Sequence, residues 1–225
     1  MTQLNTRALK GLFRSILTLA ALIFLPTWTI DYWQAWVFLG VLTTATLMIT
    51  VYLMRHDPKL LERRMTAGPI GEKETSQQII MSCATVAFIA VILIPSLDHR
   101  FMWSTVPVSL VLFGNALVIS GLYYIFLVFK ENTFTSGTIA IHKEQKVIST
   151  GPYAWIRHPM YSGGIVFIFG IPLALGSYWG LSAAVVLTII IVWRLLEEER
   201  FLAKNLVGYG KFQATVPYRL IPYIW

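Results

Sequence analysis

The amino-acid sequence predicts an all-α, multi-pass transmembrane helical bundle of about six spans, and three observations support this. Hydrophobic residues make up 56% of the 225 residues and charged residues only 13%, whereas soluble domains carry roughly 25% charged residues. Six apolar stretches can be drawn, most of which approach the ~20 residues that a helix needs to cross the hydrocarbon core. Basic residues also gather in alternate connections. The stretches lie at about residues 11–30, 33–54, 78–96, 105–129, 161–176 and 178–196.

The first stretch, residues 11–30, follows a basic N-terminal segment and could be mistaken for a signal peptide. No small-x-small cleavage site follows it, so we expect it to be retained as a helix. Trp28, Tyr32 and Trp33 then form an aromatic belt of the kind found at membrane surfaces. This belt leads into the second stretch, residues 33–54.

A short amphipathic helix is expected in the connection after the second stretch. Asp57 is a plausible N-cap, and Pro58 suits the first helical position. The apolar side chains of this helix can face lipid while its basic side chains face headgroups. It could be an interfacial spacer or could guide a lipid substrate. The apolar residues are Leu60, Leu61 and Met65, and the basic ones are Lys59, Arg63 and Arg64.

The third and fourth stretches, residues 78–96 and 105–129, are followed by the longest non-apolar segment of the chain, residues 130–155. Loops of this length are usually functional or disordered. Apolar residues alternate with polar ones within it, so we expect an ordered segment that folds back on the membrane. The alternating residues are Ile139, Ile141, Val147 and Ile148.

The last two stretches predict a helical hairpin. Residues 161–176 are short for a span and are interrupted by Pro172 and Gly176, so the turn is expected at Gly176 and the following serine. The final helix continues beyond residues 178–196 and carries three adjacent carboxylates, Glu197 to Glu199, out of the apolar region. Unpaired carboxylates next to anionic headgroups are unfavourable, so these glutamates should bind something cationic.

The chain has 18 Lys and Arg residues and a formal net charge of +7. All of them except Arg100 fall on one side of the expected bundle, including Lys73 and Lys143 in the two long connections. The positive-inside rule therefore predicts an integral membrane protein with both termini in the cytoplasm, in a plasma or inner membrane, or in the endoplasmic reticulum of a eukaryote. Nucleic-acid binding is not indicated. We expect one domain over residues 1–225, with N-terminal spans in 1–129 and a loop, hairpin and C-terminal cap in 130–225.

Candidate chemistry lies at the two ends of the hairpin. Pro159 disfavours a helical backbone at His158, so a helix should begin near Met160, and its free N–H groups would favour an anion. Arg157 adds a fork of donors suited to a carboxylate. In the final helix, Arg194 is four residues from a glutamate and shares its face.

Several other chemistries find no support in the sequence. The four histidines have no metal-ligand spacing, and no glycine-rich phosphate loop or serine-centred elbow is present. We therefore expect no metal. Cys83, the single cysteine, lies inside an apolar stretch, where packing is its expected role.

Three motifs resemble the isoprenylcysteine carboxyl methyltransferase and phospholipid methyltransferase family. They are Val-Ile-Ser-Thr-Gly-Pro-Tyr at residues 147–153, Arg-His-Pro-Met-Tyr-Ser-Gly at 157–163, and Arg194 followed by Glu198 and Glu199. The resemblance covers about residues 130–225. The N-terminal half adds an Asp-Pro-x-x-Leu-x-x-Arg stretch at 57–64.

This resemblance implies S-adenosylmethionine as methyl donor, bound in a cofactor pocket at the cytoplasmic membrane surface. A sulfonium favours aromatic faces and carboxylates, and the donor's carboxylate favours arginine or free N–H groups. Arg194 and Glu198 would stand at the acceptor site as catalytic residues. The expected cofactor contacts are Lys146, Val147, Ile148, Tyr153, Arg157, His158, Pro159, Met160, Tyr161 and Glu199.

The resemblance thus implies a methyltransferase whose partners are membrane lipids and a lipophilic methyl acceptor. That acceptor could be a prenylated cysteine carboxylate, a phospholipid amine such as phosphatidylethanolamine, or a quinone- or terpenoid-like molecule. Two alternatives stay open at this stage. Arg-His-Pro-x-Tyr also occurs in membrane sterol reductases, which would make the chain an NADPH-dependent sterol or enone reductase. The chain could also be a non-catalytic membrane scaffold that has kept the pocket.

Overall fold

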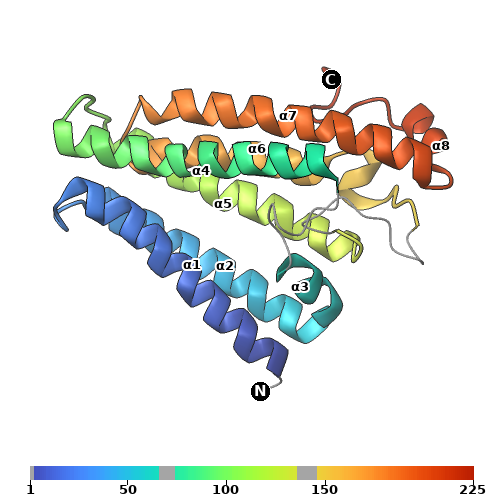
Figure 1. Cartoon of the computed structure of the whole chain (residues 1–225), viewed down its shortest axis with the longest axis horizontal. Coiled ribbons are helices and arrows are strands. Elements are labelled where there is room, and N and C mark those ends of the chain that lie inside the picture. Colours follow the sequence, from blue (N-terminus) through green and yellow to red (C-terminus); the bar gives the residue numbers. More distant parts are fainter. Residues whose placement is uncertain (1–2, 66–73, 136–145) are drawn as a thin grey trace.

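The computed structural model describes residues 3–65, 74–135 and 146–225. Over these residues every regular element is a helix, and the long helices form an elongated bundle (Figure 1). The predicted all-α class is therefore confirmed. The elements are α1 (Gln3–Thr27), α2 (Trp33–His56), α3 (Pro58–Met65), α4 (Thr75–Phe101), α5 (Val108–Glu131), the 3₁₀ turn η2 (Gly151–Ala154), α6 (Pro159–Ala174), α7 (Gly180–Asn205) and α8 (Tyr209–Thr215).

Among the described residues, five helices are long and apolar enough to cross a membrane, namely α1, α2, α4, α5 and α7. The sixth apolar helix, α6, has only 16 residues, and it occupies the stretch that the sequence predicted to be short. Pro172 lies inside α6, and Gly176 adopts the left-handed φ of 73° in the turn that follows. The predicted hairpin of α6 and α7 is therefore confirmed.

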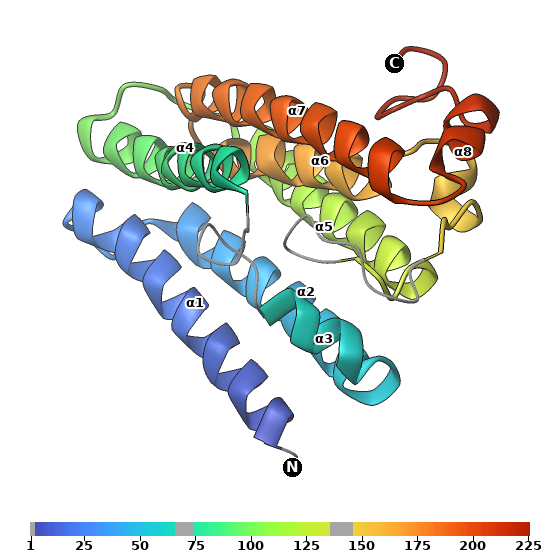
Figure 2. The same cartoon turned by 45° about the vertical axis from the view of Figure 1, so that its right-hand side comes forward.

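The connections fall into two groups at opposite ends of the bundle. The turns α1–α2, α4–α5 and α6–α7 lie at one end, and α3 and α8 lie at the other, in both views (Figures 1 and 2). Arg100, in the last turn of α4, belongs to the first end. The predictions that concern Lys73, Ile139, Ile141 and Lys143 fall outside the described residues.

Helices α5 and α6 pack with their backbones close together, because glycines occupy their interface. A Cβ atom on Gly121 of α5 would lie 2.6 Å from the carbonyl oxygen of Gly163 in α6. One on Gly170 would lie 2.8 Å from the carbonyl oxygen of Gly114. No side chain fits at such distances, so these glycines fix α6, and the segment that enters it, against α5.

A buried carboxylate joins the α4–α5 and α6–α7 connections. Asp98 is only 1% exposed, although it lies near the end of α4. It accepts hydrogen bonds from the backbone N–H of Ser104 at 2.8 Å and from the hydroxyl of Ser177 at 2.5 Å. The Ser104 hydroxyl donates to it as well. Asp98 therefore fixes the hairpin turn at the end of the bundle away from α3 and α8.

Candidate active site

The loop that precedes α6 is anchored to the end of α5. Gly151 opens the η2 turn with a φ of 57°, a left-handed conformation that favours glycine. A Cβ atom there would lie 2.7 Å from a carboxylate oxygen of Glu131, and the hydroxyl of Thr150 donates a hydrogen bond to the same side chain. The glycine therefore allows the loop to approach α5 closely.

The backbone at Arg157 and His158 pairs with the C-terminal tail. The N–H of Arg157 donates to the carbonyl oxygen of Tyr218 at 2.9 Å, and that of His158 donates to Arg219 at 3.0 Å. His158 has φ −124° and ψ 59°, outside the helical region, and α6 begins at the next residue, Pro159. This agrees with the non-helical backbone and the helix start that the proline predicted.

Glu199 is the centre of a buried ion-pair cluster. Its two carboxylate oxygens accept from Nε of Arg157 at 2.6 Å and from Nε of Arg219 at 2.7 Å. Nη1 of Arg157 also donates to the carbonyl oxygens of Val216 and Pro217, each at 2.8 Å. Arg157 and Glu199 are 7% and 5% exposed. The cluster therefore ties the loop, α7 and the tail together.

His158 lies beside this cluster, with its side chain almost fully buried. Its Nε2 atom is 3.3 Å from a carboxylate oxygen of Glu199, which is an ion-pair distance. The contact lacks the geometry of a hydrogen bond, and Nε2 has no hydrogen-bond partner among the described residues. A buried polar atom without a partner is unfavourable unless a ligand or water satisfies it.

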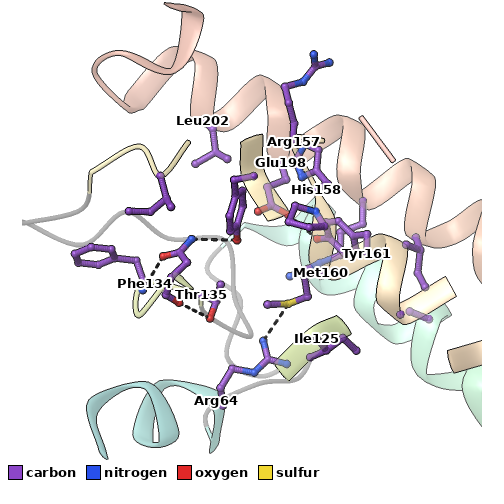
Figure 3. Close-up of a pocket in the computed structure, with 18 of the residues that line it drawn as sticks. Arg64, Ile125, Phe134, Thr135, Arg157, His158, Met160, Tyr161, Glu198 and Leu202 are labelled. Atoms are coloured by element: carbon purple, nitrogen blue, oxygen red, sulfur yellow. Dashed lines mark hydrogen bonds between the residues drawn. The ribbon is translucent and has the colours of Figure 1, made fainter. Parts of the chain in front are cut away.

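A cavity of about 540 Å³ lies next to this cluster, and residues of α3, α4, α5, α6, α7 and α8 line it (Figure 3). Part of its lining is polar and aromatic and part is apolar. The polar and aromatic residues include Lys146, Tyr153, His158, Tyr161, Arg194, Glu198 and Tyr209. The apolar residues include Ile80, Ala84, Phe88, Ile125, Phe167, Ile168, Leu187 and Ile190. The apolar residues belong to α4, α5, α6 and α7, so the cavity extends from the helix ends into the apolar bundle.

Arg194 and Glu198 both line this cavity from α7. The hydroxyl of Tyr161 donates to Oε2 of Glu198 at 2.5 Å, and Nη1 of Arg194 donates to Oε1 of Gln77 at 3.2 Å. Gln77 is 5% exposed, so this bond lies within the protein. The cavity thus places a guanidinium and a carboxylate close to apolar walls.

Two tyrosines contribute phenols to the polar lining. Burial raises the pKa of Tyr153, and the charge of Glu198 adds to this effect, whereas a hydrogen bond from Asn132 at 3.1 Å opposes it. Burial raises the pKa of Tyr209 too, with smaller effects of nearby carboxylates. Both phenols are therefore protonated at neutral pH. Tyr209 is 4% exposed, and its hydroxyl has no hydrogen-bond partner in the part of the chain that the structure describes.

All but one of the site residues that the sequence predicted line this cavity. They are Lys146, Val147, Ile148, Tyr153, Arg157, His158, Pro159, Met160, Tyr161, Arg194 and Glu198. The exception is Glu199, whose two carboxylate oxygens form ion pairs with Arg157 and Arg219. Glu199 directly follows Glu198 on α7, so helical geometry turns its side chain away from the face that Arg194 and Glu198 share. The sequence did not assign Arg64, Gln77, Asn132 or Tyr209 to the site, although all but Gln77 line this cavity.

Helix α3 differs from the prediction. Asp57 does cap it, because its Oδ1 accepts from the N–H of Leu60 at 2.9 Å. The prediction that Leu60 and Leu61 face lipid is wrong, since they are 0% and 6% exposed and pack in a cluster with residues of α1, α2 and α5. Arg63 and Arg64 also have contacts within the protein, since Nη1 of Arg63 donates to the carbonyl oxygen of Thr133 at 2.6 Å and Nη1 of Arg64 lies 3.7 Å from the sulfur of Met160. Arg64 is the one residue of α3 that lines the cavity.

Comparison with known families adds one finding. Residues 103–208 match the family model described as phospholipid methyltransferase. The match includes α5, η2, α6 and α7, and it confirms the resemblance that the sequence motifs indicated. It supports a membrane methyltransferase acting on lipid-like substrates. A search of curated proteins found no match.

Proposed function

We propose, from the family match over residues 103–208, that this chain is an S-adenosylmethionine-dependent methyltransferase acting on a lipophilic acceptor at the cytoplasmic membrane surface. The observation that carries the proposal is the composition of the cavity, which joins polar and aromatic groups to an apolar lining within the bundle. A water-soluble donor suits the first part, and a lipid-like acceptor suits the second.

The residues of the polar part fit the donor chemically. Glu198 and the rings of Tyr153 and Tyr161 offer the negative charge and aromatic faces that a sulfonium favours. The hydroxyl of Tyr209, which has no hydrogen-bond partner among the described residues, offers a polar contact to a ligand. So does Nε2 of His158, whose 3.3 Å contact with Glu199 lacks the geometry of a hydrogen bond. The backbone of residues 146–148 and the start of α6 complete the proposed donor site.

Arg157 has a different role in this proposal from the one that the resemblance implied. Its Nε and Nη1 atoms are engaged by Glu199 and two tail carbonyls. We therefore assign Arg157 and Glu199 to holding the loop and the tail in place, so that His158 and Tyr161 are correctly positioned.

In this proposal, Arg194 and Glu198 bind the methyl acceptor and prepare it for methyl transfer. S-adenosylmethionine supplies a methyl carbon bonded to a cationic sulfur, and its transfer to a carboxylate oxygen yields a neutral ester and a neutral thioether without moving a proton. For an isoprenylcysteine-type carboxylate, Arg194 orients the acceptor oxygen. For an amine acceptor, Glu198 accepts the proton that must leave. In both cases the main contribution of the protein is positioning.

Calorimetric titration of the purified protein with S-adenosylhomocysteine tests the donor site. We expect saturable binding, weakened about two- to tenfold by Tyr209→Phe through loss of one hydrogen bond. Tyr223→Phe is the matched control, because Tyr223 is 77% exposed and should leave the affinity unchanged. No binding at millimolar ligand would contradict the proposal.

Mass spectrometry of lipid extracts after incubation with an isotopically labelled methyl donor tests the transfer itself. The expected result is a labelled lipophilic product that is absent with Glu198→Gln or Arg194→Gln. Oxidation of NADPH with an enone acceptor, without any labelled product, would support the reductase instead. An unchanged cellular phenotype with both variants would support a scaffold.

A further inference from the structure

A patch of apolar side chains lies on the surface of the protein after α8. We call it the tail patch, and it consists of Ile221, Tyr223, Ile224 and Trp225. Tyr223 and Ile224 are 77% and 76% exposed, and residues 220–225 include no charged side chain. An exposed patch of this kind marks an interaction surface. The exposed residues of α8 are small or polar instead, namely Gly210, Lys211, Ala214 and Thr215.

The backbone holds the tail patch in one defined turn. The N–H groups of Leu220 and Ile221 both donate to the carbonyl oxygen of Trp225, at 2.9 and 3.1 Å, and the N–H of Trp225 donates back to Ile221 at 3.1 Å. Tyr223 adopts a φ of 64° within this turn, which is unusual for a bulky residue. The guanidinium carbon of Arg219 lies 5.1 Å from the ring centre of Trp225. The patch is therefore a folded part of the molecule.

A hydrogen bond places the start of the tail patch beside the first turn of α6. The hydroxyl of Ser162 donates to the carbonyl oxygen of Leu220 at 2.7 Å. With 16 residues, α6 is about 24 Å long, which is less than the roughly 30 Å of a hydrocarbon core. Since its other end reaches the hairpin turn at the opposite end of the bundle, its first turn lies at or inside the membrane boundary.

The path of the chain agrees with this depth. After α8, which lies at the end of the bundle, the chain turns back, and its C-terminus lies nearer the middle of the bundle than α8 does in both views (Figures 1 and 2). Residues 221–225 directly follow Leu220. They therefore lie close to the membrane boundary at the end of the bundle that carries α3 and α8.

We propose that the tail patch is a membrane anchor that inserts into the interfacial region of the lipid bilayer at this end of the bundle. Tyrosine and tryptophan are enriched in that region because each joins an apolar ring to a polar group. Arg219, whose side chain is 33% exposed, extends beside the patch and can keep its charge among the headgroups. The anchor is independent of the proposed function, since it requires neither donor nor acceptor.

The anchor acts on the candidate site because the same segment holds the loop before α6. The carbonyl oxygens of Tyr218 and Arg219 accept from the N–H groups of Arg157 and His158. Arg219 also forms an ion pair with the buried Glu199 at 2.7 Å. Insertion of the tail patch into the bilayer therefore stabilises the loop that carries His158, and loss of insertion should loosen it.

Depth-dependent fluorescence quenching tests the insertion. The full-length protein with Cys83→Ser and Ile224→Cys is labelled with an environment-sensitive fluorophore and placed in nanodiscs. The lipids carry a nitroxide on the headgroup, high on the acyl chain or at the end of the acyl chain. We expect the headgroup and upper-chain nitroxides to quench the probe about threefold more strongly than the chain-end nitroxide, because interfacial residues lie at that depth.

Two labelled positions are matched controls for depth. Val207, between α7 and α8, is 95% exposed, and a probe at Val207→Cys should be quenched only weakly by all three lipids. Ile189, in the apolar part of α7, is 64% exposed, and a probe at Ile189→Cys should be quenched most by the chain-end nitroxide. Quenching at position 224 no stronger than at position 207 would overturn the anchor. Shielding of position 224 from aqueous iodide without lipid quenching would indicate a protein partner and overturn it too.

Hydrogen exchange tests the effect on the loop. In nanodiscs, Ile224→Asp should speed exchange of the Arg157 and His158 amides about tenfold, because a charge opposes insertion and the loop opens more often. Ile224→Ser should have a smaller effect in the same direction. Ala214→Asp, which adds the same charge at an exposed position of α8, should leave these amides unchanged, and amides of α5 should be unchanged in all three variants. Equal exchange in Ile224→Asp and Ala214→Asp would overturn the link between the anchor and the loop.

Discussion

At the scale of single residues, Glu197 and Glu199 are two positions apart on α7 but have opposite surroundings. The partner of Glu197, Arg200, is 74% exposed, whereas the side chains of Glu199 and its partner Arg157 are each 6% exposed. A buried carboxylate between two guanidinium groups cannot be removed without leaving uncompensated charge. An exposed ion pair such as that of Glu197 and Arg200 contributes little to the stability of the fold.

We therefore expect Glu199→Gln to lower the free energy of unfolding by about 3–5 kcal/mol, as for other broken buried ion pairs. Glu197→Gln should change it by less than about 1 kcal/mol. Denaturant unfolding of both variants in the same detergent measures the difference. Equal effects would mean that the buried cluster does not hold the loop and the tail.

At the scale of helices, Gln77 of α4 accepts a hydrogen bond from Arg194 of α7 and so connects the two helices at the site. Gln77→Leu removes the amide oxygen that accepts from Arg194 at 3.2 Å. We expect kcat/KM for the acceptor to fall about tenfold or more, in line with a lost hydrogen bond to a charged group, while affinity for S-adenosylhomocysteine is unchanged. Ser76→Ala, at an exposed position next to Gln77 in α4, should have little effect. Equal losses in both variants would contradict this role.

The α5–α6 interface allows a second test at this scale. Gly121→Ala places a Cβ atom 2.6 Å from a backbone oxygen of α6, so the helices must separate. The cost should be about 1–3 kcal/mol, as for other overpacked interiors. At Gly40 of α2 no atom lies within 4 Å of an added Cβ, so Gly40→Ala should be neutral or slightly stabilising through helix propensity. A thermal shift of the same size in both variants would refute the packing argument.

At the scale of the whole molecule, the distribution of charge predicts the orientation in the membrane. Cys83 is exposed and is first replaced by serine. Single cysteines at Arg100 and at Lys59 then mark the two ends of the bundle that Figure 1 shows. An impermeant thiol reagent added to intact cells should label Arg100→Cys and spare Lys59→Cys. The reverse pattern would place the termini outside the cytoplasm.

Local features of the sequence predicted much of the fold and most of the candidate site. The apolar stretches predicted the long helices because a span needs about 20 apolar residues whatever its neighbours are. Pro172 and Gly176 predicted the hairpin turn, and Asp57 predicted the cap of α3, because proline, glycine and N-cap preferences act over a few residues. Arg194 and Glu198 followed from helical spacing and from the motif.

What the sequence alone determined is therefore the membrane class, the hairpin and the motif residues, since hydrophobicity, backbone restriction and i,i+4 spacing are local properties. Only the tertiary structure decided which distant residues meet. It paired Arg157 and Arg219 with Glu199, buried Asp98, and brought Arg64 and Gln77 to the site from α3 and α4, which lie outside the family match at residues 103–208. Such contacts depend on which faces of separate helices pack together, and no short stretch of sequence encodes that.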